Sequence, residues 1–294
     1  MVAIVRRLQD SDRNDVMEIS RHIWEGHDYL LSVVDQWLQD PNCHFYGVEV
    51  GSHVVAVGNL RLVEDGRTGW LEGLRVHPEH RGKGLANEIT RHLVKRAEHL
   101  GVQRLRYTTS NRNAASLKLA KMAGFSKILS MAVSWHLKPK RIPMFGDYPP
   151  IQKRSPKRAC NLLETTPRIV PHGILTYDWK ALDNTCQNLE EIGRTHTFYI
   201  ALSSKRVDSL SFGCSRNHEP NGTGWSFTIY AADSHGFLSQ VSHNVAIALK
   251  HGFSSIMCTF ETRFEKTMNA VDLGSEKHQG THLVLLEKQI RTRK

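Results

Sequence analysis

The chain has 294 residues, of which 40% are hydrophobic and 23% charged, and its formal net charge is +10 at pH 7. This composition excludes disordered and fibrous proteins, and the length allows one large or two medium domains, each with its own core. The positive charge favours an anionic partner, and nucleic acid, an acidic membrane surface and a phosphate-bearing ligand are all consistent with it.

The sequence predicts a cytoplasmic protein. Its first residues, MVAIVRRLQDSDRND, become charged too early for a secretory signal, and no apolar run is long enough to span a membrane. The cysteines are odd in number, widely spaced and free of any CxxC pair, so we expect reduced thiols, with neither a disulfide framework nor a zinc site. These cysteines are Cys43, Cys160, Cys186, Cys214 and Cys258.

Alternating strands and helices are predicted for residues 1–137. Apolar alternation between turn residues indicates strands, over 2–8, 44–50, 53–63, 70–76, 102–109 and 128–137. Apolar residues at helical spacing, with capping residues, indicate helices after Ser11 or Asp12, before Pro41, over 84–100 and over 113–123. This order predicts a mixed α/β domain that ends near residue 137.

Residues 138–160 are predicted to be a basic, proline-rich linker. Between residues 138 and 158 the chain has seven Lys or Arg against one Asp, and its prolines disfavour regular structure. Since this segment carries most of the excess positive charge, neither flanking domain is expected to have a basic face. We therefore expect no nucleic-acid partner and no membrane partner.

The sequence of residues 161–294 predicts a second α/β domain. The segments 99–125 and 250–275 share one order: a helix that ends at Gly, a short strand, and a further helix before another Gly. Upstream, GWLEGLRV is matched by GWSFTIYAA, and a last strand, THLVLLEKQ, closes the second copy. The C-terminal half is thus either a degenerate structural repeat of the first half or a chance similarity between two α/β units.

Residues 71–89, LEGLRVHPEHRGKGLANEI, join a strand to a helix through two glycines. A helix N-terminus has unpaired backbone N–H groups and a partial positive charge, which suit an anion. Gly82 and Gly84 let the main chain approach a ligand, and Arg81 and Lys83 add positive charge. We interpret the segment as a pyrophosphate cradle that differs both from the NTPase loop, where Ser or Thr follows the Lys, and from the dinucleotide pattern GxGxxG.

The cradle resembles the acetyl-CoA signature of the GCN5-related N-acetyltransferases, Arg/Gln-x-x-Gly-x-Gly/Ala, through Arg81, Gly84 and Ala86. The residues that match a second family element, Asn-x-x-Ala/Ser followed by Gly-Phe, are Asn113, Ser116, Gly124 and Phe125. The resemblance covers residues 2–137 and implies the family's fold, acetyl-CoA as cosubstrate and no metal. It assigns CoA binding to Leu74, Val76, Arg81, Gly82, Lys83, Gly84, Leu85, Ala86 and Asn113.

The resemblance also implies direct transfer of the acetyl group to an amine, with Glu72 as general base. A typical α-amino group is protonated at neutral pH, so a carboxylate that accepts its proton is needed. Alternatively, Glu72 is a strand residue that faces solvent. Gly73 is expected to permit a bulge beside it. The tyrosine that many family members use as general acid is replaced by Ala120, which leaves Tyr107, Tyr46 or water for that role.

The stretch IWEGHDYLLSVVDQWLQDP corresponds to the roof of the acceptor site in this family. Its GHDYL and WLxDP, with the later YDW at 177–179, resemble the vertebrate-type histidine N-acetyltransferases. That resemblance implies acetylation of the α-amino group of a free amino acid, with L-histidine as the lead. Asp28 would pair with the substrate, and Trp24, His27 and Tyr29 would line the pocket; helix capping for the Asp and core packing for the aromatic residues are the alternatives.

Three functions stay open on the sequence. The first is an N-acetyltransferase for a small-molecule amine. The second is acetylation of peptide or protein amines, which needs an open acceptor groove, whereas the aromatic roof suggests a closed pocket. The third is a non-catalytic acyl-CoA sensor, which has no need of a base at Glu72. The oligomeric state is open as well.

Overall fold

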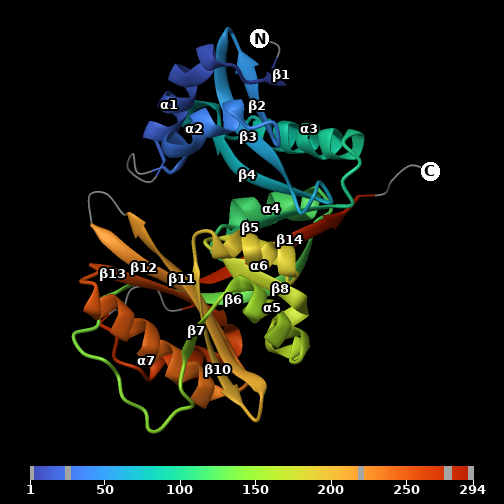
Figure 1. Ribbon diagram of the computed structural model, residues 1–294. Helices are drawn as coiled ribbons and strands as arrows, with labels where there is room; N and C mark the ends of the chain where they lie inside the picture. Colours follow the sequence, from blue (N-terminus) through green and yellow to red (C-terminus); the bar gives the residue numbers. More distant parts are fainter. Residues whose placement is uncertain (1–2, 24–27, 218–221, 275–279, 291–294) are drawn as a thin grey trace. The chain divides into compact units, whose positions relative to one another are not determined.

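The protein is described by a computed structural model, which defines residues 3–23, 28–217, 222–274 and 280–290 (Figure 1). Its contacts form two compact units. The first unit comprises Met1–Tyr107, Ala114–Ile128 and Leu286–Lys294, and the second comprises Thr108–Asn113 and Leu129–Leu285. Each unit therefore contains chain from both halves of the sequence.

The first unit is built on a sheet in which β4 and β5 are parallel and the other neighbouring strands antiparallel. Its strands, in spatial order, are β1 (Ile4–Arg7), β2 (Cys43–Val50), β3 (His53–Val63), β4 (Thr68–Val76) and β5 (Arg104–Ser110). The hairpin between β2 and β3 turns at Gly51 and Ser52, both with positive φ. Because two parallel strands need a crossover connection, α3 (Leu85–His99) joins β4 to β5.

Helices cover both faces of this sheet. Figure 1 shows α1 (Arg13–Arg21) and α2 (Leu30–Gln39) on one side and α3 on the other. Trp37 of α2 is 2% exposed, and its ring meets Phe45 of β2 edge-on at 5.2 Å. A Cβ on Gly58 of β3 would lie 3.2 Å from Leu93 of α3. Because Gly58 has no side chain, α3 packs directly on β3. Helices α1 and α2 lie on the other face of the same sheet.

The second unit repeats this plan with a sheet in which β12 and β13 are parallel. Its strands, in spatial order, are β6 (Ser126–Leu137), β13 (Ser255–Glu261), β12 (Thr223–Ala231), β11 (Arg206–Asn217), β10 (Thr197–Ser203) and β7 (Gln152–Arg154). The crossover between the parallel strands is α7 (Ser234–Lys250). Phe237 of α7 stacks on Phe264 with ring centroids 4.7 Å apart and so anchors the helix in an apolar cluster.

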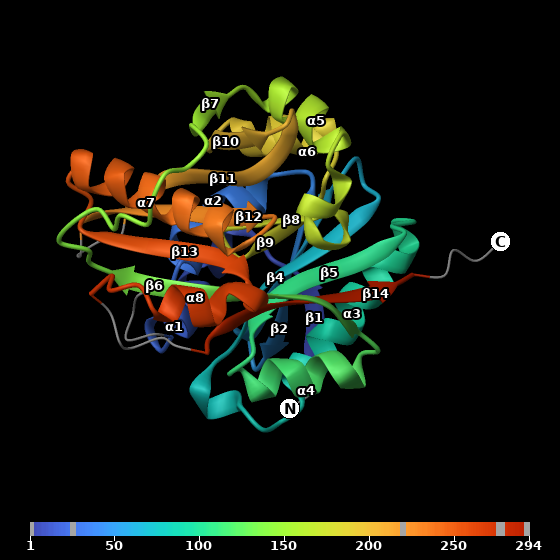
Figure 2. The same cartoon turned by 90° about the horizontal axis from the view of Figure 1, so that it is seen from below.

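The remaining elements of the second unit pack on its sheet beside β10 and β11. Figure 2 shows α5 (Pro156–Glu164) and α6 (Cys186–Gly193) side by side, next to these strands. A small hairpin of β8 (Ile174–Tyr177) and β9 (Lys180–Asp183) contacts β12. There the backbone N–H of Thr176 donates to the hydroxyl of buried Tyr230, at 2.7 Å.

The two halves of the chain exchange their last strands. The order β10, β11, β12, α7, β13, α8 (Glu265–Asn269), β14 (His282–Gln289) repeats the order β2, β3, β4, α3, β5, α4 (Ala114–Met122), β6. Most of β6 pairs with β13 in the second unit. The end of β14 belongs to the first unit, where the N–H of Ile290 donates to the carbonyl of Gln103 at 2.9 Å.

The predicted linker is shorter than expected. β7 and α5 both begin within residues 138–160, because Ser155 and Pro156 form a helix start. The Ser155 hydroxyl accepts from the backbone N–H of Arg158 at 3.3 Å, and proline suits the first helical position. Composition alone hid this start, since the same proline also suggests a break in structure. Among the described residues, no helix has the length and apolar character needed to cross a membrane.

The prediction that all five cysteines are reduced was wrong. Cys160 of α5 and Cys186 of α6 form a disulfide, with their Cα atoms 5.2 Å apart. The two residues are 26 positions apart in sequence, and only the packing of α5 against α6 brings them together. Cys43, Cys214 and Cys258 are free thiols, as expected.

Candidate active site

The predicted cradle lies at the start of α3 and is open to solvent. Gly82 and Gly84 have φ of 76° and 82°, in the left-handed region that glycine enters without strain. A Cβ built on either glycine meets nothing within 4 Å. The glycines are therefore required by their backbone conformation, and the space beside them is free for a ligand.

The cradle fits a pyrophosphate group. The backbone N–H groups of Asn87 and Glu88 donate to the carbonyl of Gly84, and the amides that precede them come too early in the helix for such an acceptor. Arg81 and Lys83 are exposed on the same loop. Bare amides at a helix N-terminus, flanked by two cations, form a favourable site for a diphosphate.

The strand before the cradle is bulged and only partly paired. Gly73 and Leu74 together lie opposite Gly58, which is the bulge expected at Gly73, whose φ is 69°. β4 pairs with β5 only through Thr68, Gly69 and Trp70, whereas it continues to Val76 beside β3. The part of β4 that contains Leu74 and Val76 is therefore not paired with β5. An unpaired backbone edge is required if this part of the strand is to bind an extended ligand arm.

Glu72 lies on β4 immediately before this bulge. Its side chain is 11% exposed, so it does not face bulk solvent. Its Oε1 accepts from Nδ2 of Asn59 at 3.1 Å and from Nε of Arg61 at 3.0 Å. The contact with the guanidinium is charge-assisted, and the two contacts together fix the orientation of the Glu72 carboxylate.

Asn59 and Arg61 are residues that the sequence analysis missed. Both lie on β3, where the bulge sets the register that brings them to Glu72. Asn59 is fully buried, and its Oδ1 has no hydrogen-bond partner among the residues that the structure describes. The one available signal was their spacing of two, which places two polar side chains on one face of a predicted strand.

Two of the predicted acceptor residues lie together near the bulge. The Asp28 carboxylate is fully buried and accepts two hydrogen bonds from Arg75, at 2.9 and 3.0 Å. The ring of Tyr29 lies beside the same guanidinium, at 5.3 Å, and its hydroxyl hydrogen-bonds to the backbone of Gly73. Burial raises the pKa of Tyr29. Trp24 and His27 lie outside the described residues.

Arg75 changes the role that Asp28 can play. The sequence analysis expected the carboxylate of Asp28 to pair with the substrate. In the structure both of its oxygens are bound by Arg75. Asp28 therefore neutralises and positions Arg75, which in turn orders Tyr29. Arg75 was missed because arginine at an exposed strand end is common and gives no signal without the register.

The candidates for the general acid lie in different surroundings. Ala120 is buried in α4. The hydroxyl of Tyr107 donates to the carbonyl of Ser116 at 3.3 Å, and burial raises the pKa of Tyr107. The ring of Tyr46 packs against His92 at 4.4 Å. Asn113 precedes α4, and its backbone N–H donates to the carbonyl of Ser110 at 2.9 Å.

The corresponding position in the second unit is acidic. Asp233 caps α7, where its Oδ1 accepts from the N–H of Gly236 at 2.9 Å. A Cβ on Gly236 would lie 2.7 Å from Oδ2 of Asp208. Burial and the neighbouring Asp233 raise the pKa of Asp208. Two carboxylates, the N-cap Asp233 and Asp208 of β11, thus lie at the start of α7, where they would repel a diphosphate.

Comparison with known proteins agrees with this geometry. Residues 12–125 match the model of the acetyltransferase (GNAT) family. The histidine N-acetyltransferase of Oreochromis niloticus is 37% identical over 82 residues, which are 28% of this chain and 24% of that protein. The histidine N-acetyltransferase of Xenopus tropicalis is 30% identical over 90 residues, 31% of this chain and 28% of that protein. The chain thus matches about a quarter of the length of these curated relatives.

Solved structures extend the likeness to the whole chain. A tandem GNAT protein from the clavulanic acid biosynthesis pathway aligns over 100% of both chains with a TM-score of 0.62 and 13% identity. The GCN5-related N-acetyltransferase from Kribbella flavida aligns over 98% of this chain and 71% of its own, with a TM-score of 0.57 and 12% identity. These neighbours share the fold, and the first supports the interpretation of the second half as a repeat. Residues 12–125 thus resemble the acetyltransferase (GNAT) family in sequence, and the whole chain shares the fold of these neighbours.

Proposed function

We propose that the protein is an acetyl-CoA-dependent N-acetyltransferase that acts on the amine of a small molecule. The observation that carries this proposal is Glu72, a shielded carboxylate held by Arg61 on the strand that leads into the cradle. A protein that only binds acyl-CoA needs the cradle and has no use for a carboxylate held in this way.

The CoA-binding residues take distinct roles in this proposal. The amides and cations of residues 81–86 hold the pyrophosphate, and the backbone at Leu74 and Val76 holds the pantetheine arm. Asn113 is assigned to the far end of that arm by its match to the family motif alone. Glu72 takes a proton from the acceptor amine, directly or through water, and the neutral nitrogen then attacks the thioester carbonyl carbon. The nitrogen then loses a second proton to water, the C–S bond breaks, and the CoA thiolate leaves and takes up a proton from solvent.

The acceptor in this proposal is the α-amino group of a free amino acid, with L-histidine first. The relatives named histidine N-acetyltransferases support this choice. The charge of Arg75, beside the same bulge, is already balanced by Asp28, so this choice rests on the relatives. His27, adjacent to Asp28 in sequence, and Trp24, four positions before it, stay in the proposal as pocket residues.

The test is turnover of acetyl-CoA with a panel of the amino acids, several polyamines and a few peptides, followed by thiol release and product mass. Turnover with free histidine that is lost in Glu72→Gln supports both the acceptor and the base. Turnover with peptides alone would show a peptide or protein N-acetyltransferase. Binding of acetyl-CoA with silence across the panel would show an acyl-CoA sensor and overturn the enzymatic proposal.

A further inference from the structure

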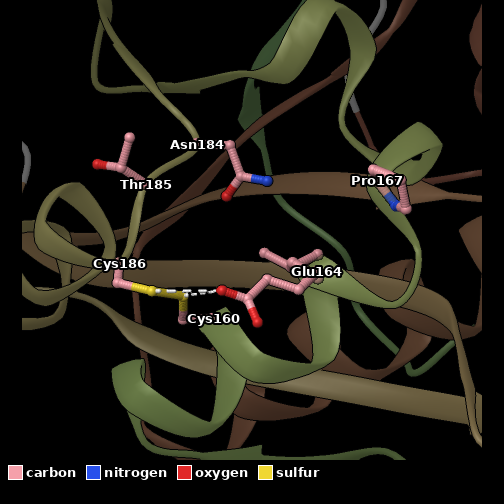
Figure 3. Close-up of a pocket in the computed structure, with 7 residues that line it drawn as sticks. Cys160, Glu164, Pro167, Asn184, Thr185 and Cys186 are labelled. Atoms are coloured by element: carbon pink, nitrogen blue, oxygen red, sulfur yellow. Dashed lines mark hydrogen bonds between the residues drawn. A yellow bond between two sulfur atoms is a disulfide. The ribbon is translucent and has the colours of Figure 1, made fainter.

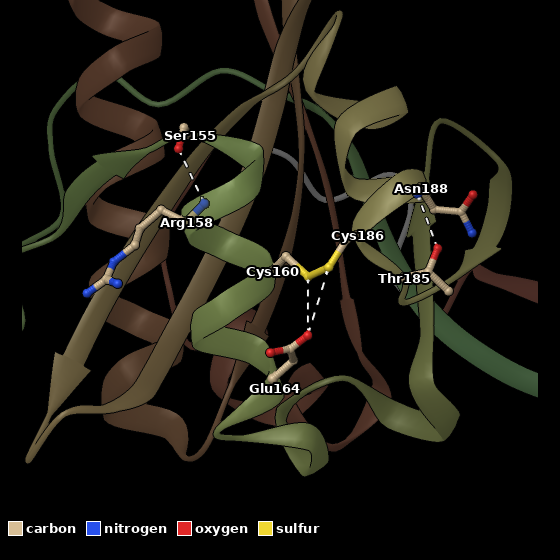
Figure 4. The surroundings of a disulfide bond; sticks show 7 residues. All are labelled: Ser155, Arg158, Cys160, Glu164, Thr185, Cys186 and Asn188. Carbon is tan, nitrogen blue, oxygen red and sulfur yellow. Dashed lines mark hydrogen bonds between the residues drawn. A yellow bond between two sulfur atoms is a disulfide. The ribbon is translucent and has the colours of Figure 1, made fainter.

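The two sulfurs of the disulfide in the second unit lie in different environments (Figure 4). Cys160 is in the body of α5 and is 4% exposed. Cys186 is the first residue of α6, directly after the N-cap Thr185, and is exposed. An incoming thiol can therefore reach Cys186 and is blocked from Cys160.

A carboxylate lies against both sulfurs. Oε1 of Glu164, one helical turn after Cys160, is 3.8 Å from the Cys160 sulfur and 3.9 Å from the Cys186 sulfur (Figure 3). A disulfide has no S–H group, so neither contact is a hydrogen bond in the oxidised pair. Once the pair is reduced, either thiol can donate to this oxygen. The carboxylate is thus placed to take up and return the proton of a thiol.

A cavity of about 240 Å³ opens beside this disulfide (Figure 3). Its lining residues are Cys160, Leu163, Glu164, Pro167, Asn184, Thr185 and Cys186. Oδ1 of Asn184 is buried and has no hydrogen-bond partner within the described part of the chain. A buried amide oxygen that is unsatisfied in a cavity favours a ligand with an N–H group.

We propose that Cys160–Cys186 is a thiol–disulfide exchange site for a small peptide thiol bound in this cavity. The thiol would donate a peptide N–H to Asn184 and place its sulfur in line with the exposed Cys186. This activity lies outside the acetyl transfer proposed for the first unit and does not depend on it.

The exchange is balanced in two steps. In the first step Glu164 takes the proton of the incoming thiol, and the sulfur of that thiol bonds to the Cys186 sulfur. The Cys160–Cys186 bond breaks, and its electron pair goes to the Cys160 sulfur. The Cys160 sulfur then takes the proton from Glu164. In the second step another small thiol attacks the sulfur of the first small thiol in the mixed disulfide. This releases the Cys186 thiolate, which takes the proton of the second thiol. One small disulfide and two cysteine thiols result. The N-terminal amides of α6 stabilise the departing Cys186 thiolate, which speeds this second step.

Full-length protein, purified without reductant and incubated with millimolar glutathione, tests the proposal. Mass spectrometry after alkylation should find reduced Cys160 and Cys186, and Cys160→Ser treated with oxidised glutathione should carry its adduct on Cys186. Cys186→Ser should leave Cys160 unmodified. Resistance of the pair to glutathione, or an adduct on Cys160, would overturn the proposal.

Glu164 and Asn184 are tested by rate. Glu164→Gln should slow exchange at least tenfold and flatten its pH profile, whereas Glu190→Gln, an exposed carboxylate on α6, should change neither. Asn184→Ala should raise the glutathione concentration at which the exchange rate is half-maximal. The slower reaction with dithiothreitol, which has no peptide group, should not change. Equal loss with both thiols would show a structural role for Asn184 and contradict the cavity assignment. Circular dichroism checks that each variant is folded.

Discussion

Glu72 joins two requirements that rarely coincide in a surface carboxylate. It is nearly buried, so few waters compete for it, and Arg61 and Asn59 hold its side chain in place. The Glu72–Arg61 pair is partly shielded from solvent, and most such arginine–carboxylate pairs serve the fold and have no part in catalysis. What distinguishes this one is its place on a bulged strand before an anion cradle.

Replacing Glu72 by Gln should lower kcat by about 10²- to 10⁴-fold, because general bases typically contribute that much. The amide keeps the shape and an acceptor for Arg61, so the dissociation constant for acetyl-CoA should not change. Steady-state kinetics and calorimetry measure the two quantities. Glu49→Gln on β2, which loses a more exposed pairing with Arg6 of β1, serves as the control. Equal losses in both variants would assign the effect to folding.

His44 of β2 should make stability pH-dependent. Both of its ring nitrogens are buried without a partner among the described residues, and burial, with the charges of Arg96 and Arg7, lowers its pKa. The unfolded chain, with a histidine pKa of about 6.5, therefore binds the proton more readily. The free energy of unfolding should fall as the pH drops below that value.

Urea unfolding at a series of pH values measures this effect. His44→Gln should unfold with a weaker dependence on pH in the acid range, whereas the same change at exposed His251 should leave the slope intact. A slope equal to wild type in His44→Gln would show that another group is responsible.

At the scale of elements, the turn into α3 depends on backbone conformation. Gly84→Ala forces an L-residue to φ near 82°, which costs roughly 1–2 kcal/mol, and it fills space that a diphosphate would use. The KM for acetyl-CoA should rise about tenfold, equivalent to about 1.4 kcal/mol. Gly101→Ala, at the far end of α3, has a similar φ of 72° and open space around it. It should lose similar stability and keep its KM.

The disulfide between α5 and α6 should contribute stability through the loop that it closes. Its cysteines are 26 positions apart, and such a loop restricts the unfolded chain by roughly 3 kcal/mol. The double variant Cys160→Ser/Cys186→Ser should unfold at correspondingly lower urea than oxidised wild type. Reduced wild type should match the variant; a large difference between the two would show that contacts other than the cross-link are lost.

At the scale of the whole molecule, each unit contains a last strand from the other half of the sequence. The end of β14 belongs to the first unit, and most of β6 belongs to the second. Arg106 of β5 is 4% exposed, and its Nε donates to Oε2 of Glu287 in β14 at 2.7 Å. The first unit therefore depends on residues 286–290 for the completion of its sheet.

Glu287→Gln should lower the free energy of unfolding by about 2 kcal/mol, as expected when a buried charged donor loses its ionised acceptor. Hydrogen exchange should report lost protection in β5. Glu261→Gln, which breaks a pair with half-exposed Arg263 in the second unit, should cost less than about 1 kcal/mol. Undiminished protection of β5 in Glu287→Gln would contradict the exchange.

The sequence by itself determined the elements and the cradle. The order of strands and helices, the bulge at Gly73 and the glycine turn at 82–84 all depend on local backbone preferences, which neighbouring residues set. A start such as Ser155-Pro156 was hidden because proline favours both a helix beginning and a break.

Only the tertiary structure decided which distant residues meet. The contacts of Glu72 with Arg61, of Asp28 with Arg75 and of Cys160 with Cys186 depend on strand register and helix packing. Each of these pairs holds residues 11 to 47 positions apart, and no local preference encodes such a distance. The same holds for the exchanged strands: both β6 and β14 are last strands in the sequence order, and only tertiary pairing places β6 beside β13 and β14 beside β5.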